Sequence, residues 1–239
     1  MRSALNWVAG AVGAAAGAYA GYAGVTWLRY GSPAPPEADD ADPLLDQLMP
    51  VYDVAERHHV HVAAPAGITF AAACEQDLMA LPLVRAIFKV REILVRSEPD
   101  TTTHPRGLLA LTKSIGWGVL AEVPGREIVM GAVTQPWSAN VVFRPLPPRE
   151  FAAFDEPGYV RIAWTLRADP IGTDASIFRT ETRAVATDVV ARAKFRRYWS
   201  FLSPGIILIR WASLQPVRAE AERLARLGTL LGPTSHRSL

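Results

Sequence analysis

The chain has 239 residues, of which 50% are hydrophobic, with a net charge of +2 at pH 7 and a single cysteine, Cys74. This length allows one domain with a sizeable core. The small net charge argues against a nucleic-acid-binding protein, and the lone cysteine excludes an internal disulfide and a cysteine-based metal site.

The chain begins with a long uncharged stretch. No charged side chain occurs between Arg2 and Arg29. At ~1.5 Å of rise per helical residue, the distance from Trp7 to Trp27 is about 30 Å, which matches the hydrocarbon core of a bilayer. Tryptophan favours the headgroup level, so the two rings suit the two membrane surfaces. The sequence therefore predicts a transmembrane helix over residues 1–31, acting as a single-pass N-terminal anchor.

This stretch consists mainly of alanine and glycine. Gly13, Gly17 and Gly21 recur at every fourth position and form a groove of small residues on one helix face. Such grooves let two membrane helices approach closely, so we expect self-association through this face. The alternative is an alanine- and glycine-rich helix that stays monomeric in lipid.

Two other interpretations of the N-terminal stretch stay open because its hydrophobicity is weak for a spanning helix. Residues 18–20 and 21–23 both resemble the small-residue cleavage site of a secretory signal peptide. The stretch is also compatible with a helix that packs on the soluble domain. One arginine flanks each end, so the positive-inside rule does not decide the orientation, and we expect the domain on the cytoplasmic side of the membrane.

The composition changes after Gly31. Three prolines and four carboxylates follow within residues 33–42. Proline favours extended backbone, and clustered carboxylates repel one another and stay hydrated. We therefore expect a linker over residues 32–48, a folded domain over 49–227, and a frayed tail over 228–239.

The first part of the domain combines one strand with helices. Alternating apolar residues predict a strand over 51–63. Helical spacing of apolar residues follows over 68–96, where Pro82 breaks the pattern into two helices because it lacks a backbone donor. A polar loop over 98–106 and a helical turn over 108–114 complete this part.

The middle of the domain reads as antiparallel strands. Strands are expected over 116–122, 127–134 and 141–144, with a Pro124-Gly125 turn between the first two and a short helix within 145–154. Two longer strands over 158–168 and 176–187 form a second hairpin. In the last strand the apolar and small residues alternate with Arg179, Glu181 and Arg183.

From Asp188 the pattern is helical. Ser203 followed by Pro204 is typical of a helix cap and first turn, so we expect a second helix to begin there. This helix continues to about Arg226, with a kink near Pro216. The element order predicts an α+β fold in which a curved antiparallel sheet wraps a long C-terminal helix and leaves a cavity.

Two segments resemble the START-like helix-grip superfamily (SRPBCC), which includes polyketide cyclase-like and lipid-transfer domains. They are HHVHVAAPAGITFAAACEQDL, residues 58–78, and FRTETRAVATDVVARAKFRRYWSFLSPGIILIR, residues 178–210. The second is similar to the end of a bacterial, largely uncharacterised subgroup. The resemblance covers residues 50–226 and implies a hydrophobic pocket for lipids, sterols or polyketide-like molecules. A few members of the superfamily catalyse cyclisation or hydrolysis.

Candidate ligand-binding residues come from the last hairpin and the helix after it. Glu181 and Arg183 share one strand face, where they would fix a ligand's polar end or serve acid–base chemistry. The alternative is an ion pair on the sheet surface, or one that joins the sheet to Arg192 or Arg196. For the aromatic candidates the alternative is an ordinary core, which is the more common role of such residues. The full set is Trp164, Phe178, Glu181, Arg183, Tyr198 and Trp199.

The clustered histidines do not suggest a metal centre. Of His58, His59 and His61, only the last two share a strand face, and a third ligand is missing from the pattern. We expect neither a metal nor another cofactor.

Together these observations predict a membrane-anchored domain that binds a hydrophobic small molecule or lipid in an internal cavity. One alternative is a cyclase- or hydrolase-type enzyme that uses Glu181 beside His61 or Tyr159. Another is a membrane scaffold without a ligand, which pairs through its glycine stripe.

Overall fold

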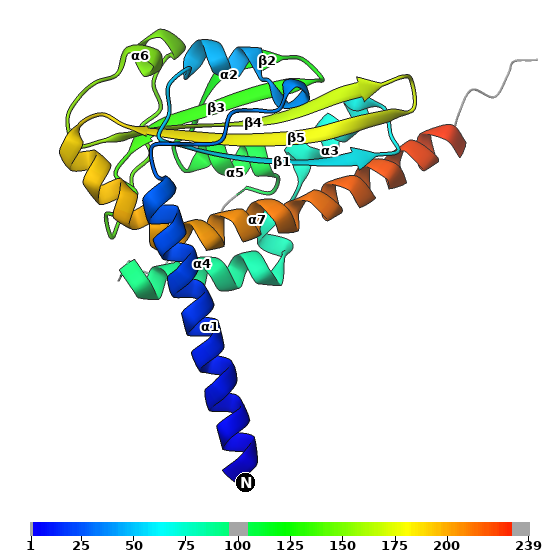
Figure 1. Cartoon of the computed structure of the whole chain (residues 1–239). Coiled ribbons are helices and arrows are strands. Elements are labelled where there is room, and N and C mark those ends of the chain that lie inside the picture. Colours follow the sequence, from blue (N-terminus) through cyan, green and yellow to red (C-terminus); the bar gives the residue numbers. More distant parts are fainter. Residues whose placement is uncertain (1, 96–104, 231–239) are drawn as a thin grey trace, which may run out of the picture.

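Five antiparallel strands form the centre of the protein. The structure, a computed structural model, describes residues 2–95 and 105–230 (Figure 1). The strand order across the sheet is β1-β5-β4-β3-β2, so the last strand lies between the first and the fourth. The strands are β1 (Val54–Val62), β2 (Gly118–Val123), β3 (Glu127–Thr134), β4 (Val160–Ile171) and β5 (Ala175–Ala186).

Helices lie on both sides of this sheet. The longest, α7, closes the described chain and runs below the sheet in the view of Figure 1. Together, the sheet and α7 confirm the expected α+β class and are consistent with a helix-grip arrangement. The α-helices are α1 (Arg2–Arg29), α2 (Pro43–Leu48), α3 (Ala66–Glu75), α4 (Pro82–Val95), α5 (Leu108–Ser114), α6 (Pro148–Ala153) and α7 (Val189–Leu230); short 3-10 helices are η1 (Ala38–Asp40) and η2 (Leu78–Ala80).

Most of the elements expected in the domain are confirmed. The helical region divides at Pro82, which begins α4, and β3 has the predicted bounds. Gly125 takes a φ of 70° in the predicted turn between β2 and β3. The short strand expected over 141–144 is reduced to a single bridge between Val133 and Arg144. The loop expected over 98–106 falls mostly outside the described residues, as does the tail beyond residue 230.

The two faces of the sheet are covered by different parts of the chain. Directly opposed residues of an antiparallel pair share a face, as do Val60, Phe178 and Ala168 across β1, β5 and β4. These residues pack under α3 and α7, and we call this side the inner face. The opposite side, the outer face, is covered by α2 and α6.

Only the last third of α1 packs on the domain. The Tyr19 hydroxyl donates to the Phe201 carbonyl of α7 at 2.5 Å, and the Tyr22 and Ser203 hydroxyls lie 2.9 Å apart. The remainder of α1 projects away from the domain (Figure 1). Gly17, on this projecting part, has no other atom within 4 Å of the position that a Cβ would take. Self-association through the glycine stripe therefore stays a prediction.

The predicted transmembrane helix over residues 1–31 needs a correction. The helix itself is present as α1, and its last third packs on the domain, as one alternative interpretation expected. Within residues 2–95 and 105–230, however, no helix combines the length and the hydropathy needed to cross a bilayer. The physical reason is composition, because α1 consists mainly of alanine and glycine, which are much less apolar than leucine or isoleucine.

The segment predicted as a hydrated linker packs against the outer face. Leu45 is fully buried, and Met49, the residue directly after this segment, is almost so. Asp42 caps α2, since its Oδ1 accepts a hydrogen bond from the Leu45 backbone N–H at 2.9 Å. The carboxylates of this segment are not simply hydrated, because the sheet offers them arginine partners.

The break expected at Ser203 and Pro204 is absent, and α7 is one continuous helix through both Pro204 and Pro216. Ser203 does not act as a cap: its side chain is fully buried, and its hydroxyl pairs with Tyr22 of α1. Tertiary packing on α1 and on the sheet therefore outweighs the hydrogen bond that each proline removes.

Candidate functional site

The four aromatic candidates lie on the inner side of the sheet. Trp164 and Phe178 belong to the apolar cluster that joins the sheet to α3 and α7, where they are 4% and 2% exposed. Tyr198 and Trp199 lie in the first half of α7, in a second cluster with Phe195. The Phe195 ring centroid is 6.1 Å from that of Tyr198 and 5.8 Å from that of Trp199. These aromatic side chains are closely packed, and their role in ligand binding stays a prediction.

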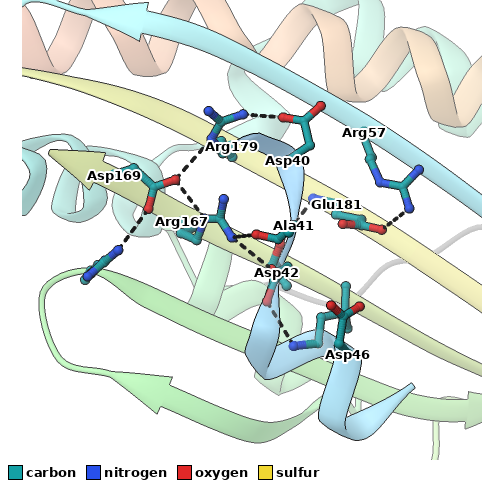
Figure 2. Close-up of polar contacts among 12 residues, drawn as sticks. Asp40, Ala41, Asp42, Asp46, Arg57, Arg167, Asp169, Arg179 and Glu181 are labelled. Atoms are coloured by element: carbon teal, nitrogen blue, oxygen red, sulfur yellow. Dashed lines mark hydrogen bonds and ion pairs between the residues drawn. The ribbon is translucent and has the colours of Figure 1, made fainter. Parts of the chain in front are cut away.

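Glu181 and Arg183 are on the outer face, opposite the aromatic candidates. Arg183 is fully buried, and its guanidinium contacts Glu181 Oε1 at 2.7 Å, Asp46 Oδ1 at 2.6 Å and the Met49 carbonyl at 3.0 Å. Glu181 also pairs with Arg57 at 2.9 Å (Figure 2). Glu181 and Arg183 therefore form an ion pair on the sheet, which was the alternative to a ligand site in the sequence analysis. Their further partners are Asp46 of α2 and Arg57 of β1. Glu181 contacts neither His61 nor Tyr159 among the described residues.

The ion pairs continue along the outer face toward the β4–β5 hairpin. Asp169 accepts from Arg167 at 2.9 Å and from Arg179 at 3.0 Å. Arg179 also pairs with Asp40, and Arg167 donates to the Ala41 carbonyl at 2.7 Å (Figure 2). The N-terminal segment is thus attached to the outer face by a row of arginines.

A small opening lies among these charged side chains. Its volume is about 10 Å³, which is about the room of one water molecule. It is too small for a drug-sized ligand. The contacts of the outer network join the N-terminal segment to the sheet. The charged residues that line the opening include Asp40, Asp42, Arg57, Arg167, Arg179 and Glu181.

Glu127 makes the outer face sensitive to pH. Its side chain is almost fully buried; burial, together with the nearby Asp42 carboxylate, raises its pKa from 4.5 to about 8. The folded protein therefore holds a proton that the unfolded chain releases between these two values. This contribution to the free energy of unfolding is fully present below pH 4.5 and is lost as the pH rises to about 8.

We expect Glu127→Gln to remove this pH dependence, because the amide stays neutral. Between pH 5 and pH 8, the free energy of unfolding of the native protein should fall relative to that of the variant by up to ~1.4 kcal/mol per pH unit. Chemical denaturation at several pH values measures the difference. The exposed Glu122→Gln is the matched control and should leave the slope unchanged. Parallel pH profiles for the native protein and Glu127→Gln would contradict the assignment.

The clustered histidines divide between the two faces. His59 and His61 point to the outer side, where His59 Nδ1 lies 3.8 Å from Asp40 Oδ1. His58 points to the inner face, where it is directly opposite Thr180 of β5. The three side chains therefore do not converge on one point.

A second group of polar side chains lies between the inner face and α7. Arg210 of α7 donates to Thr180 Oγ1 at 3.2 Å, and its guanidinium carbon lies 5.2 Å from the centroid of the Trp164 ring. Glu56 and His58 of β1 are directly opposite Thr182 and Thr180, so all four share the inner face. We call the group of Glu56, His58, Thr180, Thr182 and Arg210 the inner polar site.

The inner polar site has unsatisfied hydrogen-bonding groups. His58 Nε2 and Thr182 Oγ1 are buried without a hydrogen-bond partner. Within the described part of the chain, Arg210 has no carboxylate partner. Buried polar groups are almost always paired, so a cluster of unpaired groups needs an explanation.

Burial shifts the pKa values of the charged members. It lowers the pKa of Arg210 to about 10 and raises that of Glu56. Burial also lowers the pKa of His58, and the positive charge of Arg210 adds to this effect. Near neutral pH the site therefore combines the partly buried Arg210 cation with a neutral His58 imidazole whose Nε2 has no hydrogen-bond partner.

Sequence reasoning missed Arg210, although a signal was present. The helical repeat places one face of α7 along Trp199 and residues 203, 210, 214 and 217. In the structure this face is turned to the sheet. An arginine in the middle of an otherwise apolar or small-residue face is unusual, because charged residues are rarely buried without a partner.

Comparisons with known proteins yield distant structural similarities. No protein-family model matches the sequence, and no curated protein does. A protein from Chromobacterium violaceum is 13% identical, with a TM-score of 0.32, over 70% of this chain and 97% of that one. A point mutant of norcoclaurine synthase from Thalictrum flavum is 9% identical, with a TM-score of 0.33, over 73% and 95%. An aromatase/cyclase from Streptomyces sp. R1128 is 13% identical, with a TM-score of 0.23, over 75% and 98%. Similarities at this level assign no function to the chain.

Proposed function

We propose that the domain binds a small molecule with an apolar body and one negative charge, and that Arg210 holds the charge. The observation that carries this proposal is the partly buried Arg210 guanidinium, which has a threonine and an aromatic ring beside it but no carboxylate among the described residues. An isolated cation between a sheet and a helix loses hydration, and an anionic ligand would restore the lost interactions.

The neighbouring groups suit the rest of such a head group. His58 Nε2 and Thr182 Oγ1 have free hydrogen-bonding capacity on the same face of the sheet. The adjoining apolar cluster, with Trp164 and Phe178, would contact the apolar body. Because this cluster is closely packed, the ligand would enter as α7 shifts from the sheet. Pro204 and Pro216 each remove one helical hydrogen bond of α7 and favour bending there.

Three probes separate the parts of this proposal in isothermal titration calorimetry. Decanoate supplies head and tail, decanol supplies the tail alone, and acetate supplies the head alone. We expect decanoate to bind most tightly, because only decanoate meets both the cation and the apolar cluster. Arg210→Gln should weaken decanoate binding by about 10- to 100-fold, the usual value of a hydrogen bond to a charged group.

Two variants serve as controls for this experiment. Arg210→Lys retains the charge and should keep part of the affinity. Arg197→Gln removes an exposed arginine from the same helix and should leave binding unchanged. Equal affinity of the native protein for decanoate and decanol, or an Arg210→Gln variant that folds and binds decanoate normally, would refute the proposal.

A further inference from the structure

Helix α4 has one face that packs on the domain. Val84 is fully buried, and Ile87 approaches α7 so closely that a Cβ on Gly205 would lie 3.0 Å from its methyl group. These contacts fix the orientation of α4 beside α7. Given this orientation, the helical repeat determines which α4 residues point away from the domain.

A second face of α4 is apolar and open to solvent. Leu83, Val90, Ile93 and Leu94 are between 43% and 68% exposed. Their spacings of three, four and seven residues place them along one side of the helix. Contiguous exposed apolar residues are uncommon on a protein surface and mark an interaction site.

This apolar face continues onto α7. Leu208 and Trp211 are 44% and 63% exposed. Helical spacing places Leu208 on the side of α7 that is turned away from the sheet, since Arg210 and Leu214 face it, and places Trp211 at the flank between these two sides. In Figure 1, α4 lies on the side of α7 away from the sheet, which is also the side from which α1 projects.

The charges on α4 indicate which partner suits this face. The helix carries Arg85, Lys89 and Arg91 against a single acidic residue, Glu92. Arg85 and Lys89 are exposed and lie along a side of the helix next to the apolar face, where Lys89 also pairs with Glu92 at 2.9 Å. A helix with an apolar face beside a basic one is typical of segments that lie in the interface of an anionic membrane.

We propose that α4 and the outward side of α7 dock on the surface of an anionic lipid bilayer. In this arrangement α4 lies in the plane of the membrane, with Leu83, Val90 and Leu94 at the boundary between headgroups and acyl chains. Arg85 and Lys89 contact lipid phosphates, and the Trp211 ring lies at the headgroup level. The proposal concerns peripheral contact and is independent of ligand binding at Arg210.

An environment-sensitive label tests this arrangement in the full chain. Cys74 is the sole cysteine, and burial raises the pKa of its thiol to about 12, so an added exposed cysteine is labelled selectively. Leu94→Cys and the control Ile171→Cys, at the end of the β4–β5 hairpin, are labelled with a nitrobenzoxadiazole dye. The labelled proteins are mixed with phosphatidylcholine vesicles, with and without about 30% phosphatidylglycerol.

We expect the fluorescence at position 94 to rise several-fold with anionic vesicles, with little change at position 171. Doxyl-labelled lipids should quench the signal at position 94, and the double variant Arg85→Gln/Lys89→Gln should weaken the response at least about tenfold in lipid concentration, since two charges near the surface are lost. Circular dichroism checks that each variant keeps its helices.

Three results would overturn the proposal. One is vesicle flotation of the protein without a change at position 94, which would mean that α1 alone contacts lipid. Another is an equal response to uncharged vesicles, which would remove the anionic recognition. The third is a change at position 94 that depends on protein concentration without vesicles, which would assign the face to a second copy of the chain.

Discussion

Arg183→Ala is expected to lower the free energy of unfolding by about 3–5 kcal/mol, the usual loss when one partner of a buried ion pair is removed. The Arg183 guanidinium is fully buried and joins Glu181, Asp46 and the Met49 carbonyl. Its guanidinium carbon also lies 4.5 Å from the centroid of the Tyr52 ring. Without it, the buried Glu181 carboxylate retains Arg57 alone as a counter-charge among the residues that the structure describes.

Guanidinium denaturation followed by circular dichroism measures this loss. Arg223→Ala is a suitable control because Arg223 pairs with Glu220 on the exposed surface of α7. That substitution should cost far less than Arg183→Ala, because exposed ion pairs contribute little to stability. If the two variants lost the same small amount, the outer network would have no measurable role in stability.

Leu45→Ala is expected to lower the free energy of unfolding by about 2–5 kcal/mol, as for other buried leucines. Leu45 is fully buried in the apolar cluster on the outer face, which also contains Met49, Val129 and Phe151. A hydrated linker would give no such loss, so this substitution distinguishes a packed N-terminal segment from the linker that composition predicts.

The matched control for Leu45→Ala is Val51→Ala, a few residues after the segment. Val51 is 71% exposed, so this substitution should change the free energy of unfolding by less than about 0.5 kcal/mol. Thermal unfolding of both variants, monitored by near-ultraviolet circular dichroism, provides the comparison. A Leu45→Ala variant as stable as Val51→Ala would show that the segment does not stabilise the domain.

Local periodicity was enough to predict the five strands of the sheet, but not their order. The alternation in residues 176–187 correctly assigned Phe178 and Thr180 to one face and Glu181 and Arg183 to the other. The alternation did not show which face of the sheet packs against α7, because a period of two divides the residues into two faces without distinguishing one from the other. The ligand-binding candidates were therefore drawn from opposite faces of the sheet.

Other features depend on contacts between distant parts of the chain. Composition marked residues 32–48 as hydrated because carboxylates avoid one another. Their partners, Arg167, Arg179 and Arg183, lie more than a hundred residues away, so a local pattern cannot reveal them. The same limit applies to Pro204, where packing on α1 and the sheet keeps α7 continuous.

The packing of the N-terminal segment on the outer face of the sheet also has a consequence for the order of folding. Asp46 and Arg183 are separated by 137 residues, so the N-terminal segment leaves the ribosome long before its partners. Loop-closure entropy makes such distant contacts slow to form. The β4–β5 hairpin has to assemble before the segment gains a surface to bind. Until then, Leu45 and Met49 remain exposed on the nascent chain, where chaperones have access to them.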